Sequence, residues 1–129
     1  MERVGGFNAI AIDCADPLEL ARFWAAVFGT GIESSVGDGP HYVDLLPLPG
    51  VPLLRFQRVP EPKATKNRLH LDVDIDDMDE ACARVEALGG RRISQPVTEY
   101  GYVWTVMQDP EGNEFCVGHR LSADIRDPG

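Results

Sequence analysis

The chain has 129 residues, of which 43% are hydrophobic and 26% are charged. This length suits one domain with its own core and excludes a miniprotein held together by disulfides. Acidic residues outnumber basic ones 21 to 12, and the net charge of −9 argues against nucleic acid or an anionic membrane as a partner. The apolar runs are too short for a membrane span or a signal peptide. Three cysteines without a CxxC pair suit a reducing cytoplasm.

A shift of 61 residues brings the first half of the sequence onto the second, with Asp16 falling on Asp77 and Pro49 on Pro110. In the first half, alternation and turn residues predict a strand over 7–13, a helix from Asp16-Pro17 to Gly29, and strands near 31–36, 41–46 and 53–58. In the second half, the same signals predict a strand over 69–75, a helix from Asp77 to Gly89-Gly90, and strands over 91–94, 102–107 and 114–119.

This order of elements predicts an α+β fold of two βαβββ modules in tandem, whose curved mixed sheets surround a shared cavity. We expect a single domain over 1–120, with module 1 at about 5–58, a linker over 59–67 and module 2 at about 68–120. The tail over 121–129 has no pattern and is expected to be loose.

Each helix must cover the apolar face of its sheet, so the polar residues of the same strands fall on the opposite face, toward the cavity. His70 and Glu114 lie on the first and last strands of one half, where they can come close. A neutral imidazole and a carboxylate are ligands for a divalent metal, a workable acid–base pair, or simply partners in a buried hydrogen bond. The residue types leave all three readings open.

Further candidates for ligand binding share this face. Cys116 is either a thiolate activated by His70 or Arg55, or an inert cysteine. Tyr102 and Trp104 either wall a pocket for a flat ligand or pack in the core. The remaining inward polar residues are Arg55, Gln57 and Asp72, and an inward arginine needs an anionic partner, either a ligand group or Glu114.

Three segments carry a resemblance to a known family: DPLELARFWAAVFG at 16–29, RLHLDVDIDD at 68–77 and DPEGNEFC at 109–116. The sequence resembles the vicinal oxygen chelate superfamily, also called the glyoxalase/bleomycin resistance/dioxygenase superfamily, and within it the glyoxalase-like branch. The resemblance covers about residues 5–120. It implies paired βαβββ modules around a common cavity, and a homodimer.

The resemblance also implies four metal-ligand positions, which fall on Ala9, Leu53, His70 and Glu114. Alanine and leucine cannot coordinate, so we expect no cofactor and no tightly bound catalytic metal unless a residue such as Asp72 completes the set. We therefore expect a cytoplasmic small-molecule binder of the resistance or sequestration type. The alternatives are a lyase, isomerase or similar enzyme that uses His70 and Glu114, and an interaction module without a ligand.

Overall fold

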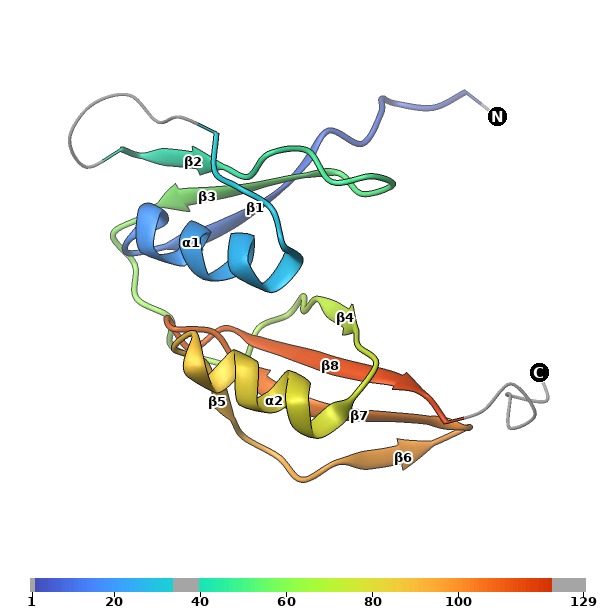
Figure 1. Cartoon of the computed structure of the whole chain (residues 1–129). Coiled ribbons are helices and arrows are strands. Elements are labelled where there is room, and N and C mark those ends of the chain that lie inside the picture. The colour runs from blue at the N-terminus through green and yellow to red at the C-terminus, as the bar shows by residue number, and fades with distance from the viewer. Residues whose placement is uncertain (1, 34–39, 122–129) are drawn as a thin grey trace. The chain divides into compact units, whose positions relative to one another are not determined.

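A computed structural model describes residues 2–33 and 40–121, and these residues form two helices and two mixed sheets (Figure 1). The α+β class is therefore confirmed. The chain divides into two compact units, Met1–Pro62 and Lys63–Gly129. None of the described helices is both long enough and apolar enough to cross a membrane.

The first unit contains β1 (Ala9–Cys14), α1 (Pro17–Phe28), β2 (Tyr42–Asp44) and β3 (Leu53–Arg58). Its sheet has the order β1-β3-β2, in which β1 is parallel and β2 antiparallel to β3. The helix α1 packs against β3 and β2, and Leu54 and Phe56 of β3 are buried as the alternation predicts. The strand expected near 31–36 is reduced to a bridge between Ile32 and Leu45, and residues 34–36 lie outside the described part.

Both helices begin at the predicted aspartates. The side chain of Asp16 accepts a hydrogen bond from the backbone N–H of Glu19 at 3.2 Å, and Asp77 accepts one from Glu80 at 3.0 Å. These bonds satisfy backbone donors that the first turn of a helix leaves free. Gly29 ends α1 in the left-handed conformation, with φ of 66°, which glycine adopts without steric cost.

The second unit contains β4 (Asp72–Asp74), α2 (Met78–Ala87), β5 (Arg91–Arg92), β6 (Val97–Glu99), β7 (Tyr102–Gln108) and β8 (Glu114–Arg120). Its sheet has the order β4-β8-β7-β5, with β6 paired to β7. The helix α2 packs on β8, β7 and β5. The buried residues of β7 and β8, the two longest of these strands, include Val103, Thr105, Met107, Phe115 and Val117. The prediction made β4 too long and missed β6.

Candidate functional site

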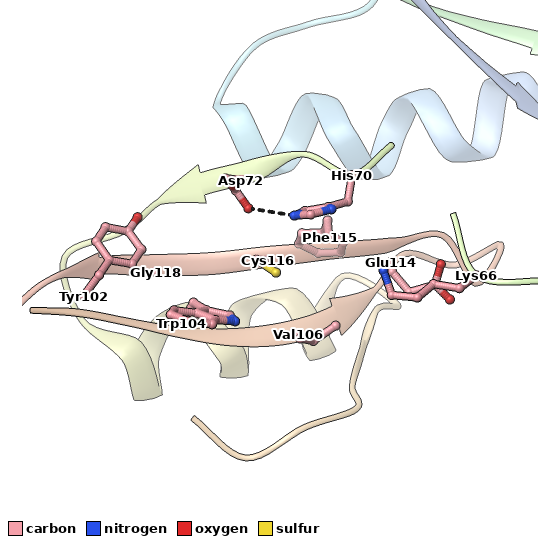
Figure 2. Close-up of a pocket in the computed structure, with 10 residues that line it drawn as sticks. All are labelled: Lys66, His70, Asp72, Tyr102, Trp104, Val106, Glu114, Phe115, Cys116 and Gly118. Atoms are coloured by element: carbon pink, nitrogen blue, oxygen red, sulfur yellow. Dashed lines mark ion pairs between the residues drawn. The ribbon is translucent and has the colours of Figure 1, made fainter. Parts of the chain in front are cut away.

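The second unit holds a pocket of about 490 Å³ on the sheet face opposite α2 (Figure 2). Its polar lining residues are Lys66, His70, Asp72, Glu114 and Cys116. The rest of the wall is Tyr102, Trp104, Val106, Phe115 and Gly118. A volume of this size is typical of sites for small organic molecules. The pocket therefore contains His70, Glu114 and four of the predicted ligand-binding residues.

Strand register explains why these residues meet. Asp72 of β4 lies beside Cys116 of β8, and Val106 of β7 lies on the other side of Cys116. His70 comes two residues before Asp72, so its side chain falls on the same face. Figure 2 shows His70 and Asp72 over the sulfur of Cys116.

The polar centre of the pocket is formed by His70, Asp72 and Cys116. The imidazole Nε2 of His70 lies 3.3 Å from Oδ1 of Asp72. One ligating atom from each of the three side chains lies within 4.8 Å of the other two. Burial raises the pKa of the Cys116 thiol, the charge of Asp72 raises it further, and Lys66 opposes both effects. Without a cation on the sulfur, Cys116 is therefore a neutral thiol at physiological pH and a weak nucleophile.

Glu114 does not share a proton with His70, because other groups hold its carboxylate. Its Oε1 accepts the backbone N–H of Asn67 at 2.8 Å, and its Oε2 pairs with Nζ of Lys63 at 3.1 Å. Burial alone would raise the pKa of Glu114, but these two partners outweigh it and lower the pKa from 4.5 to about 2. The structure thus pairs His70 with Asp72, and ties Glu114 to the segment that the sequence indicates as a linker.

Two aromatic rings line one side of the pocket. The centroids of Tyr102 and Trp104 are 6.4 Å apart, and their planes are inclined by 37°. The hydroxyl of Tyr102 donates to Oδ1 of Asp74 at 3.1 Å, and partial burial together with this bond and the nearby carboxylates raises the pKa of Tyr102. Gly118 lets the rings approach, since a Cβ there would stand 2.7 Å from Tyr102 Cε1 and 2.7 Å from the carbonyl oxygen of Val103. A side chain at position 118 would disturb this wall.

Arg55 and Gln57, predicted to bind ligand, belong to β3 of the first unit and do not line this pocket. Arg55 forms a two-point ion pair with Asp44, from Nε to Oδ1 at 2.8 Å and from NH2 to Oδ2 at 3.1 Å. The hydrogen bond and charge of Asp44 raise the pKa of Arg55. Arg55 therefore has its anionic partner within its own sheet, without Glu114 or a ligand.

The four positions at which the related family holds a metal do not suit one here. Ala9 and Leu53 carry no lone pair that can coordinate, and both oxygens of Glu114 already accept hydrogen bonds. His70 alone is left as a ligand from that set.

Four lining residues were not predicted: Lys66, Val106, Phe115 and Gly118. Val106 shares its strand face with Tyr102 and Trp104, and Gly118 shares its face with Cys116, so the alternation already contained the signal for both. Lys66 stands in the segment interpreted as a linker. Phe115 alternates with the pocket residues Glu114 and Cys116, and only 1% of its surface is exposed.

The sequence model of the family described as "Glyoxalase-like domain" matches residues 9–118. The fold is similar to that of a glyoxalase/bleomycin resistance protein/dioxygenase family enzyme from Burkholderia phytofirmans, with a TM-score of 0.72 and 23% identity over 88% of this chain and 98% of that one. TioX from Micromonospora is similar at a TM-score of 0.62 and 19% identity, over 91% of this chain and 100% of its own. No curated protein matches the sequence significantly.

Proposed function

The chain belongs to the glyoxalase-like domain family, and from that premise we propose that it binds a small organic molecule in the pocket of its second unit. The observation that carries the proposal is the pairing of an aromatic wall, Tyr102 and Trp104, with a polar group of His70 and Asp72 in one pocket of about 490 Å³. Rings supply apolar contact area, and a few polar groups fix the orientation of the ligand. We place the protein with binders of the resistance or sequestration type.

One accessible charge of the pocket, the carboxylate of Asp72, indicates a class of ligand that the pocket can bind. The side chain of Asp72 is 71% exposed, so its carboxylate is accessible as an acceptor. The carboxylate of Glu114 is instead paired with the ammonium group of Lys63. A cationic or hydrogen-bond-donating group can pair with Asp72 while a flat ring stacks on Trp104. Planar aromatic amines are therefore the class of ligand that we expect.

Replacement of Trp104 by alanine tests this proposal. A thermal-shift screen of planar aromatic amines, run with a chelator present, should identify compounds that raise the melting temperature of the wild-type protein. We expect Trp104→Ala to weaken the binding of these compounds by roughly 10- to 100-fold in calorimetric titration, because the stacking surface is lost.

Phe7→Ala is the matched control, since Phe7 is an exposed aromatic residue of the first unit and is 76% accessible. It should leave the affinity unchanged. Equal affinity of the wild-type protein and Trp104→Ala for every compound found would contradict binding in this pocket.

A second function, proton transfer on a bound carbonyl compound, is favoured by the contact between Nε2 of His70 and Oδ1 of Asp72. A carboxylate beside an imidazole orients the ring and makes it a better base. An enzyme of this kind should exchange a carbon-bound proton of a carbonyl ligand for deuterium in D₂O, as followed by NMR. His70→Gln should abolish the exchange while the ligand still binds. If the wild-type protein catalyses no exchange, this second function is contradicted and only the binding function remains.

The expected assembly and location belong to the same proposal. We propose a homodimer that works in the cytoplasm on a small organic molecule, with neither nucleic acid nor a membrane as partner. Sedimentation of the purified protein as a 14.2 kDa species would contradict the dimer.

A further inference from the structure

Three side chains of different metal-binding types converge on one wall of the pocket. His70 and Asp72 come from the segment that enters β4 and from β4 itself, and Cys116 comes from the middle of β8. Asp72 and Cys116 are direct neighbours in the parallel ladder, so the sheet itself holds two of the three in place. Imidazole nitrogen, carboxylate oxygen and thiolate sulfur are the ligand atoms that zinc takes in proteins.

The distances between these atoms suit a shared ion. His70 Nε2 and Asp72 Oδ1 are 3.3 Å apart, which is close to the separation of two tetrahedral ligands that each lie about 2.0–2.1 Å from zinc. The three ligating atoms all lie within 4.8 Å of one another, whereas a tetrahedral site needs nitrogen and sulfur about 3.6 Å apart. The side chains of His70 and Asp72 are 44% and 71% exposed, so small rotations can close this difference.

The fold does not require these residue types. The shift of 61 residues places His70, Asp72 and Cys116 on Ala9, Ala11 and Arg55 of the first unit. There Ala11 pairs with Arg55 in the same parallel register in which Asp72 pairs with Cys116. A sheet of the same register thus forms without any of the three ligands, and packing alone gives no reason for them.

We propose that His70, Asp72 and Cys116 bind a divalent metal ion of the zinc type at the wall of this pocket. Three protein ligands leave a fourth position of a tetrahedral ion for water or for a donor atom of a pocket ligand, as in catalytic zinc sites. This set shares only His70 with the four metal-ligand positions of the family. Asp72 and Cys116 supply the other two ligands, whereas Ala9 and Leu53 cannot coordinate and the carboxylate of Glu114 is held by Lys63 and Asn67. On binding, the thiol of Cys116 forms a bond to the metal and releases its proton to solvent.

Metal titration of the full-length protein, reduced and stripped with a chelator, tests the site directly. Zinc added in competition with a chromophoric chelator should bind with a stoichiometry of one. Cobalt(II) in its place should give the charge-transfer absorption of a cobalt–thiolate bond. Both Cys116→Ser and Asp72→Asn should weaken zinc binding by at least about tenfold, and Cys116→Ser should abolish the charge-transfer band.

Asp74→Asn is the matched control, and Glu114→Gln tests the ligand position of the related family, with circular dichroism to check that this less stable variant is folded during the titration. Asp74 is an exposed carboxylate on the same face two residues along, and Glu114 is the ligand position of the related family. Neither variant should change the affinity for zinc. Asp72 is exposed, so Asp72→Asn is expected to fold, and circular dichroism checks this.

The proposal is overturned if the wild-type protein binds no equimolar zinc, or if Asp72→Asn and Cys116→Ser bind zinc as the wild type does. It is also overturned if Glu114→Gln loses the metal while Asp72→Asn keeps it, since that result assigns the ion to the family position. Binding of an aromatic amine in the presence of a chelator is a separate measurement. Failure of the metal site and failure of the proposed ligand binding are therefore distinguishable.

Discussion

Replacement of Glu114 by glutamine is expected to lower the free energy of unfolding by about 2–3 kcal/mol at pH 7. The carboxylate is nearly buried, with 10% of its side chain exposed, and each oxygen has a partner, Asn67 or Lys63. Glutamine can still accept the N–H of Asn67 through its oxygen, but its NH₂ group faces the ammonium of Lys63. The variant therefore loses the ion pair and gains a contact between two donors.

The free energy of unfolding lost in Glu114→Gln should depend on pH in a defined direction. The pKa of Glu114 is lowered from 4.5 to about 2 in the folded protein. Its stabilising contribution is therefore complete above pH 4.5 and disappears as the pH falls from about 4.5 to 2. The difference in stability between the wild-type protein and Glu114→Gln should narrow over this range.

Urea unfolding at a series of pH values, followed by circular dichroism, measures this difference. Glu99→Gln, at an exposed carboxylate of β6, is the control and should change stability by less than about 0.5 kcal/mol. A difference for Glu114→Gln that is equally large at pH 3 and pH 7 would contradict the assigned partners.

Asp109→Ala is expected to lower the free energy of unfolding by about 3 kcal/mol, because it removes a buried carboxylate that accepts three hydrogen bonds from partly buried donors. Asp109 is 3% exposed. Its Oδ1 accepts the backbone N–H groups of Glu111 at 2.9 Å and Asn113 at 3.0 Å, and its Oδ2 accepts the side-chain amide of Asn113 at 3.0 Å. These bonds fix the turn that leads into β8, whose first residues line the pocket.

Chemical unfolding of Asp109→Ala measures this loss of stability. Asp76→Asn is the control, because Asp76 is an exposed aspartate and its replacement should change the free energy of unfolding little. Asp109→Asn should fall between the two variants, since its oxygen can still accept two backbone N–H groups while its amide opposes that of Asn113. A loss below about 1 kcal/mol for Asp109→Ala would show that the turn forms without these bonds.

Local signals predicted most of the elements. The caps at Asp16 and Asp77 are read from a few neighbouring residues, and β3 was predicted with the observed bounds because its alternation is clear. β6 was missed because its three residues are all exposed, so they show no alternation between two faces. An edge strand of this kind is defined by its pairing with β7 rather than by its own pattern.

Only part of the pocket lining could be predicted from the sequence, and its contacts could not. Alternation placed His70, Asp72 and Cys116 on one face, and the structure brings them together. The partners of Glu114 and Arg55 could not be read from the sequence, because they depend on tertiary contacts. Lys63 and Asn67 lie about 50 residues from Glu114, in a basic stretch that indicates exposure, and Asp44 carries no motif.

The matching ladders of the two units have a consequence for engineering. Ala11 pairs with Arg55 in the same register in which Asp72 pairs with Cys116. The first sheet therefore already has the backbone needed for a copy of the three proposed metal ligands. Ala9→His, Ala11→Asp and Arg55→Cys would transplant them there, at the cost of the ion pair with Asp44. The first unit therefore offers a scaffold in which the metal site proposed for the second unit can be rebuilt and its ligands tested.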